Sequence, residues 1–132
     1  MEESGKRQII IKIHLIISIL IVVPAAIIYG FFPDLIIDVV PKTLDEHSFQ
    51  KAVMGLYLGF SILWLVGVFK KQLLKTALFS NMVFMLGLGL GRLLSIFVDG
   101  IPSMPYLFGT FAELFLGFYG VWVIRHYWKD IH

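Results

Sequence analysis

The sequence has 132 residues, of which 58% are hydrophobic and 15% are charged. Soluble domains average about 45–50% apolar and about 25% charged residues, and a chain this short cannot bury such an excess of apolar surface in water. The composition therefore excludes an ordinary soluble enzyme domain, a disordered segment and a nucleic-acid-binding module, and it indicates a membrane protein. With no cysteine, the chain also has no disulfide, thiolate metal site or cysteine nucleophile.

Four apolar stretches are long enough to cross a bilayer, whose hydrocarbon core of about 30 Å needs about 20 helical residues. They cover approximately residues 9–32, 49–69, 73–98 and 106–124. Because backbone groups in hydrocarbon must be satisfied within their own segment, and the stretches lack strand-like alternation, we expect helices. The first stretch is longer than a signal-peptide core, so we expect it to be a retained span. The predicted fold class is all-α, a four-helix transmembrane bundle in which residues 1–132 form a single domain.

Basic residues are distributed unequally between the two ends of these helices. Eight of the eleven precede the first span, separate the second from the third, or follow the fourth: Lys6, Arg7, Lys12, Lys70, Lys71, Lys75, Arg125 and Lys129. The opposite side carries Lys42 and Lys51 among several acidic residues. The positive-inside rule therefore predicts that both termini are cytoplasmic.

The segments between the spans contain recognisable start and stop signals. Prolines bound the segment 32–41, which carries two acidic residues four positions apart and predicts a short helix in the outer interface. Thr43 and Glu46 match a capping box, so the second helix should begin one residue after Thr43. The short links at 70–72 and 99–105 predict that the second and third helices, and the third and fourth, are antiparallel neighbours.

Glycines recur at a spacing that favours helix packing. Gly55 and Gly59 form a G-x-x-x-G pair on the second helix, Gly87 and Gly91 form another on the third, and Gly117 lies on the fourth. Small residues at this spacing let helix backbones approach closely, either within one chain or between two. The run at 87–91 has no preceding strand and is not a dinucleotide-binding fingerprint.

Two ionisable residues lie inside the predicted spans. Arg92 is seven residues before Asp99, and Glu113 is seven residues after Tyr106, which places both roughly 10 Å below the outer ends of adjacent helices. An unpaired charge at this depth costs about 2.5–3.5 kcal/mol on insertion scales. The matched depth therefore predicts an ion pair between Arg92 and Glu113.

Other polar residues extend this pair into a candidate site. Ser95 and Asp99 share a helical face with Arg92, and Lys51 and Tyr57 enter from the second helix. The arrangement predicts a polar cavity that opens to the outer leaflet between the second, third and fourth helices. Its candidate ligand-binding residues are Lys51, Tyr57, Arg92, Ser95, Asp99 and Glu113.

The role of such a cavity stays open between three alternatives. The ion pair could simply hold two helices together in a structural or accessory subunit, whose glycine faces would dock a protein partner or a homodimer. It could bind a lipid or an anionic small molecule, with the apolar part between helices. It could also belong to an ion pathway in a small oligomeric transporter, although only Asn81 and Ser80 would continue a path beyond Arg92.

No reaction centre stands out in the sequence. His14, His126 and His132 are assigned to the cytoplasmic side and His47 to the outer side, and no two of them lie four residues apart. We therefore expect no metal and no other cofactor. A carboxylate paired with arginine is ionised and is a poor general acid, so the pattern favours a binding or structural role over an enzyme.

The sequence resembles a family of bacterial membrane proteins, domain of unknown function 4345, over nearly the whole chain. The likeness is carried by the segments 55–59, 91–95 and 99–103 together with Glu113. The resemblance implies a small four-span protein of the inner membrane and no established activity. Family members carry an arginine and a double glycine before the core of the second helix, where this sequence has Lys51 and the pair Met54 and Gly55.

Overall fold

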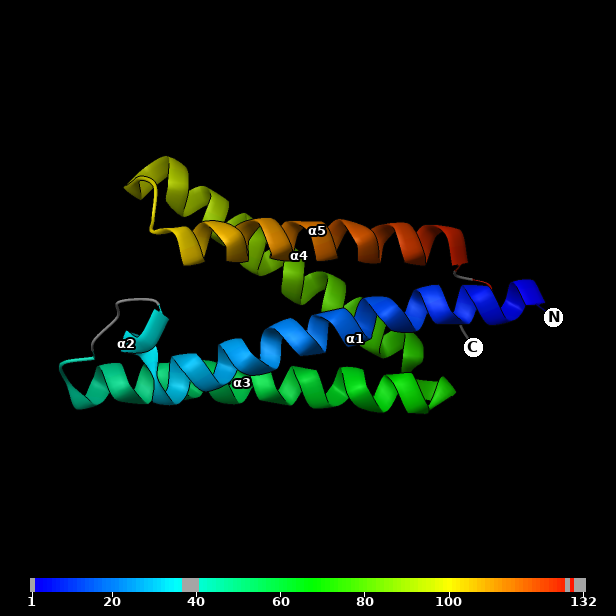
Figure 1. Cartoon of the computed structure of the whole chain (residues 1–132), viewed down its shortest axis with the longest axis horizontal. Coiled ribbons are helices and arrows are strands. Elements are labelled where there is room, and N and C mark those ends of the chain that lie inside the picture. The colour runs from blue at the N-terminus through cyan, green and yellow to red at the C-terminus, as the bar shows by residue number, and fades with distance from the viewer. Residues whose placement is uncertain (1, 37–40, 128, 130–132) are drawn as a thin grey trace.

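The computed structural model describes residues 2–36, 41–127 and 129, and helices dominate this part of the chain. The elements in chain order are α1 (Glu2–Phe31), α2 (Pro33–Ile36), α3 (Leu44–Phe69), the 3-10 turn η1 (Lys71–Leu73), α4 (Leu74–Asp99) and α5 (Met104–Tyr127). Figure 1 shows α1, α3, α4 and α5 running roughly lengthwise through the molecule. Each is long and apolar enough to cross a membrane. The predicted four-helix bundle is confirmed, and α2 occupies the place of the predicted short helix, although Asp38 lies outside the described residues.

The start of α3 follows from its first polar residues. The side chain of Thr43 accepts a hydrogen bond of 3.1 Å from the backbone nitrogen of Glu46. The Glu46 carboxylate in turn accepts from the backbone nitrogens of Thr43, at 3.3 Å, and Lys42. These bonds satisfy donors that have no partner inside the helix, and the predicted capping box and helix start are confirmed.

A turn of four residues reverses the chain between α4 and α5. Gly100 adopts a φ of 111°, a conformation that L side chains rarely adopt, and this ends α4 directly after Asp99. The backbone of Ser103 then accepts a hydrogen bond of 3.1 Å from the nitrogen of Tyr106, which starts α5. We call this end of the bundle the Gly100 end, and the opposite end, where Lys70 separates α3 from η1, the Lys70 end.

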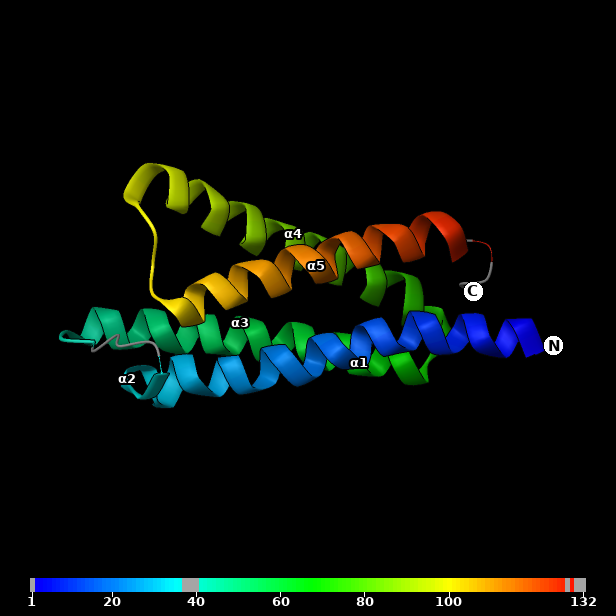
Figure 2. The ribbon, with the colours of Figure 1, turned by 45° about the horizontal axis from the view of Figure 1, so that its top comes forward.

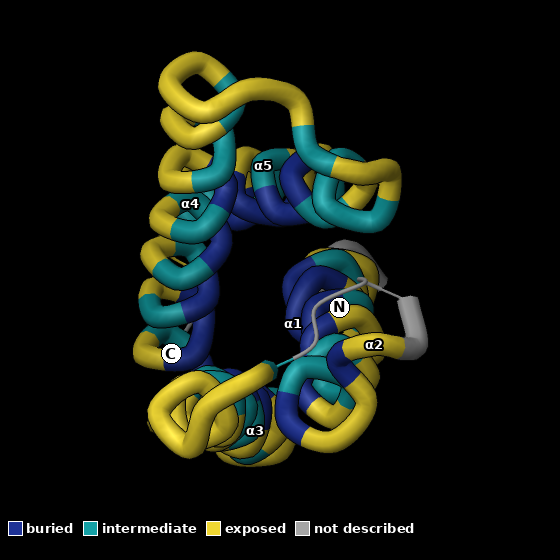
Figure 3. The backbone as a smooth tube through the Cα atoms, turned by 90° about the vertical axis from the view of Figure 1, so that its left-hand side faces the viewer, coloured by how far each residue is buried: buried dark blue, intermediate teal, exposed yellow. Residues whose placement is uncertain are grey.

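The helices pack as two pairs that share one core. The most extensive contacts join α1 to α3 and α4 to α5, and α3 also contacts α4. The neighbours predicted from the short links are therefore confirmed, whereas the pairing of α1 with α3 was not predicted. Figures 1 and 2 show that α4 starts beside α3 and moves away from it toward the Gly100 end. Seen from that end, the buried faces of all four helices point toward a common centre (Figure 3).

Small residues fix the closest approaches between neighbouring helices. A methyl group at Gly117 would lie 2.5 Å from Leu86 on α4, and one at Gly89 would lie 2.7 Å from Leu114 on α5. Aromatic side chains fill the space between α3 and α4, where fully buried Trp64 donates a hydrogen bond of 3.1 Å to Ser80. These contacts set the depth of α4 relative to both of its neighbours.

The other predicted packing glycines face outward. At Gly55, Gly59, Gly87 and Gly91 an added methyl group would meet no described atom within 4 Å. The helices of one chain therefore do not pack through these positions. A G-x-x-x-G spacing identifies a face of a helix, but it does not tell which neighbour that face meets.

Candidate functional site

The predicted ion pair joins α4 to α5 near the Gly100 end. Nε of Arg92 donates to both carboxylate oxygens of Glu113, at 3.1 Å to Oε1 and 2.9 Å to Oε2. The two side chains are only 21% and 12% exposed. A salt bridge in these surroundings neutralises two charges that hydrocarbon would otherwise exclude. The interaction that the matched depths of the two residues predict is therefore present.

A third helix contributes a partner that the sequence did not reveal. Nη2 of Arg92 donates a hydrogen bond of 3.0 Å to the hydroxyl of Tyr29, which lies on α1. Tyr29 also contacts buried Tyr57 on α3, with their ring centroids 5.7 Å apart. Arg92 is thus held by residues of two other helices, and it connects the α4–α5 pair to α1. The only signal for this role was a lone polar residue in the last turns of an apolar span.

An open hollow of about 290 Å³ lies beside the guanidinium group of Arg92. It is lined by Arg92, Ser95, Pro102, Tyr106 and Thr110. The Tyr106 ring covers the guanidinium group, with its centroid 5.6 Å from Cζ, a distance typical of a cation–π contact. We define the Arg92 cluster as Arg92, Glu113, Tyr29 and Tyr106.

The remaining predicted site residues lie at different distances from this cluster. Ser95 lines the hollow and donates a hydrogen bond of 2.9 Å to Asp99, and both residues are exposed. Tyr57 is buried, packs edge-on against Tyr29, and lies close enough to Arg92 to interact with its guanidinium group. Lys51 is exposed, lies with its Nζ 5.7 Å from the centroid of the Phe31 ring, and does not line the hollow. The hollow is therefore walled by α4, α5 and their connecting turn, without the expected wall from α3.

Polar residues that the sequence analysis did not assign to a site lie deeper in the bundle. The side chain of His14 on α1 is fully buried, and its Nε2 lies 2.8 Å from the carbonyl oxygen of Leu116 on α5. Asn81 on α4 is also fully buried. His14 lies within α1 and inside the span that the sequence predicts, so its side chain packs among the helices. We call these two residues the His14–Asn81 pair.

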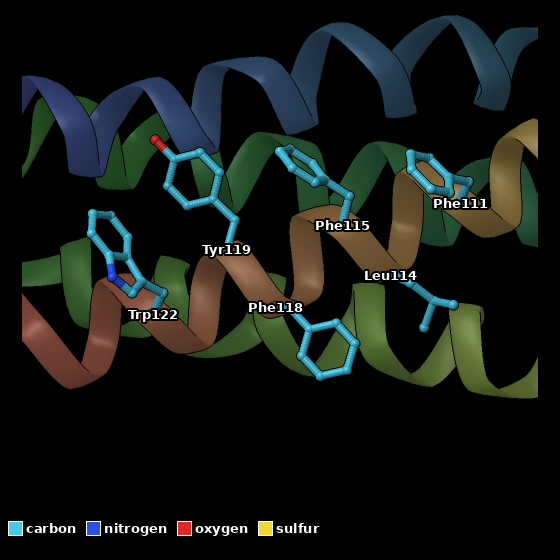
Figure 4. A pocket seen from close by; sticks show the side chains of 6 residues that line it. All are labelled: Phe111, Leu114, Phe115, Phe118, Tyr119 and Trp122. Atoms are coloured by element: carbon cyan, nitrogen blue, oxygen red, sulfur yellow. The ribbon is translucent and has the colours of Figure 1, made fainter.

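A larger hollow lies along α5 and is lined by residues of this helix alone. Its volume is about 630 Å³, and it is lined by Phe111, Leu114, Phe115, Phe118, Tyr119 and Trp122 (Figure 4). Four of these aromatic rings are exposed, as expected for a surface that contacts lipid chains. Its lining is almost entirely apolar, whereas the smaller hollow is bordered by the guanidinium group of Arg92 and by the polar residues Ser95 and Thr110. We therefore place the candidate site at the smaller hollow.

The fold and the cluster define a four-helix membrane protein with a compensated arginine near one end of its core. The family model of domain of unknown function 4345 matches residues 10–124, and the chain belongs to that family. The resemblance found in the sequence is thereby confirmed. No curated protein and no solved structure matches the chain.

Proposed function

We propose that the protein lies in the bacterial inner membrane with both termini in the cytoplasm, and that it binds the polar or anionic head of a lipid or small molecule beside Arg92. Under this topology the Lys70 end is cytoplasmic, and the hollow opens toward the outer leaflet. The distribution of lysine and arginine supports this orientation. The four apolar helices support contact with a lipid bilayer.

The proposal is carried by the arginine that borders the hollow. Glu113 engages Nε, Tyr29 engages Nη2, and neither of them binds Nη1. Guanidinium groups bind phosphate and carboxylate oxygens through directed hydrogen bonds. Because Glu113 balances the charge of Arg92, binding would depend on these directed bonds and on the polar wall formed by Ser95 and Thr110, more than on net charge.

Native mass spectrometry of the purified full chain tests this binding. Phosphatidylglycerol, phosphatidylethanolamine and inorganic phosphate serve as probes. We expect phosphatidylglycerol to stay bound under activation that removes bulk lipid, and Ser95→Leu, which fills the hollow, to reduce its retention severalfold. Ser103→Leu places the same side chain in the exposed turn outside the hollow and should leave retention unchanged. Equal retention in both variants contradicts the proposal, and displacement by inorganic phosphate would identify the ligand as a free anion.

Thiol labelling tests the topology, because the chain has no cysteine and single-cysteine variants are easily interpreted. We expect Ser103→Cys to react with a membrane-impermeant maleimide added outside intact spheroplasts. Lys71→Cys should react only after the membrane is permeabilised. The reverse pattern would invert the orientation and move the hollow to the cytoplasmic leaflet.

A structural role is the second candidate function. It is favoured by the hydrogen bonds that Arg92 forms with residues of two other helices, α1 and α5. Glu113→Gln separates the two functions. If the pair serves binding, this variant should lose lipid retention at a temperature at which the protein remains folded. If retention and thermal stability decline together, the ion pair has a structural role.

The outward-facing glycines support self-association as a further candidate. Gly59→Cys and Gly87→Cys should give specific disulfide-linked dimers in native membranes if these faces meet a second copy of the chain. Finding only monomers at native expression contradicts this assembly. Four helices could move a solute only as such an oligomer.

A further inference from the structure

The His14–Asn81 pair contains buried polar atoms that the chain leaves without a partner. Nε2 of His14 faces the Leu116 carbonyl oxygen, which can only accept a hydrogen bond, so Nε2 carries the proton. In a neutral imidazole, Nδ1 then carries a lone pair that can accept a hydrogen bond. No described residue donates to it.

Asn81 is the stronger anomaly of the two. Its amide oxygen and amide nitrogen are both buried, and neither makes a hydrogen bond with any described residue. Leaving such an atom unsatisfied costs about 1–3 kcal/mol, and hydrocarbon around the bundle offers no alternative partner. Asn81 is the only asparagine of the sequence, so an amide group stands at this one position of an otherwise apolar core face.

The two side chains lie at the same level of the bundle. A methyl group at Gly120 would be 3.3 Å from Nε2 of His14 and 3.5 Å from Cβ of Met82, the residue next to Asn81. Ser18 is fully buried one turn along α1, and its hydroxyl donates to the backbone oxygen of His14 at 2.9 Å, so its oxygen can still accept. Polar residues of α1 and α4 therefore lie at the level of Gly120 on α5.

Other buried polar side chains in the described part of the chain show what a satisfied group looks like here. Ser61 and Thr110 donate to backbone oxygens within their own helices, and Glu113 accepts from Arg92. Against this background, the unsatisfied atoms of the His14–Asn81 pair stand out, because no described residue forms a hydrogen bond with them.

We propose that the bundle contains a water-binding site between His14, Asn81 and Ser18, at the depth of the hydrocarbon core. A water molecule donates to Nδ1 of His14 and to Oδ1 of Asn81, and it accepts from Nδ2. Water fits because the residues are fully buried and the unsatisfied set mixes donors with acceptors, as buried waters require. A single imidazole and a neutral amide are a poor ligand set for a metal ion.

Water-edited solid-state NMR of the full chain in lipid bilayers tests this site. Magnetisation that starts on water is transferred to nitrogen-15 in selectively labelled His, Asn and Trp side chains. The side chain of Asn81 gives one signal, because no other asparagine is present. We expect the signals of Asn81 and of Nδ1 of His14 to build up severalfold faster than the indole signal of Trp64. Trp64 is the matched control, since it is equally buried but bonded to Ser80.

The variant Asn81→Leu tests whether the two residues share one water molecule. In Asn81→Leu, transfer from water to His14 should fall to the level of Trp64, because the shared water loses its second anchor. Transfer to both side chains as slow as that to Trp64 in the unaltered protein would overturn the proposal. An unchanged His14 signal in Asn81→Leu would also overturn it, because the two residues would then not share the site.

Discussion

The Arg92 cluster and the His14–Asn81 pair are both polar groups in an apolar bundle, but they differ in whether the chain itself supplies their hydrogen-bond partners. Arg92 carries a full charge, yet residues of α1 and α5 within the same chain compensate it. His14 and Asn81 are more deeply buried, but the described residues leave three of their polar atoms without a hydrogen bond.

The difference follows from the size of the penalty. An uncompensated charge costs about 2.5–3.5 kcal/mol even on the most lenient insertion scales, so the chain itself must supply a counter-ion at the same depth. A neutral donor or acceptor costs about 1–3 kcal/mol, and one water molecule can satisfy several of them at once. Charged groups within the spans therefore need a counter-ion from the chain itself, whereas neutral polar groups tolerate a partner from the solvent.

The largest expected effect comes from breaking the ion pair on one side only. Glu113→Leu should lower the free energy of unfolding by about 3 kcal/mol, because it leaves the guanidinium group of Arg92 without a counter-ion in a poorly hydrated site. Equilibrium unfolding of the purified protein in mixed micelles measures this change. The double variant Arg92→Met with Glu113→Leu removes both charges and should be more stable than Glu113→Leu alone. Additive losses would show that charge compensation is not what holds the cluster.

The next largest effect on stability is expected at the contact between α4 and α5, which sets Arg92 and Glu113 at the same depth. Gly117→Ala should cost about 1–3 kcal/mol, because the new methyl group would overlap Leu86 on α4. Gly87→Ala is the matched control, because its face is open within one chain, and in the purified monomer it should be neutral or stabilising by up to about 1 kcal/mol, as alanine favours helix. Thermal unfolding of both variants makes the comparison. Equal losses would mean that α4 and α5 do not meet through Gly117.

A smaller effect is expected where the cluster reaches α1. Tyr29→Phe removes the hydroxyl that accepts from Nη2 of Arg92 and should cost about 1 kcal/mol. Tyr127→Phe is a suitable control, because Tyr127 lies at the opposite end of the bundle from the Arg92 cluster, and its ring contact with Trp122 does not depend on the hydroxyl group. The two variants are compared by the same unfolding measurement. A loss in both of them would point to a general effect of the hydroxyl group.

The smallest change in the free energy of unfolding is expected at the His14–Asn81 pair, in contrast to the large change at the Arg92 cluster. Asn81→Leu should change the free energy of unfolding by less than about 1 kcal/mol, because the lost water-mediated bonds are offset by removal of a buried amide. The reverse change at a fully buried neighbour, Leu78→Asn, should cost about 3 kcal/mol, since it buries a new amide and opens a cavity. A large loss in Asn81→Leu would show that the amide has a partner within the chain.

The features that the sequence predicted well are those with large energetic signals. Apolar length identified the four spans, and the capping box located the first residue of α3. The matched depths of Arg92 and Glu113 predicted their contact because no cheaper solution exists for two charges in hydrocarbon.

The features that were missed depend on which helix faces which. Tyr29 and His14 are tolerated in an apolar helix without an obvious partner, so no penalty in the sequence marks their neighbours. The glycine pairs likewise indicated a spacing but not a direction, and Gly55 faces away from the chain, whereas Gly117 faces α4. The position of α1 beside α3 could not be predicted, since the segment that links them imposes no tight turn.

The positive φ of Gly100 has a consequence for relatives of this chain. This conformation ends α4 directly after Asp99, and the number of residues in the reversal fixes how far Arg92 and Glu113 stand from the tip of the hairpin. A homologue that keeps both charged residues but carries a bulky side chain at this position must lengthen or shorten its reversal. Such a change would slide one helix along the other, and a compensating shift of the arginine or the glutamate by one helical turn should accompany it.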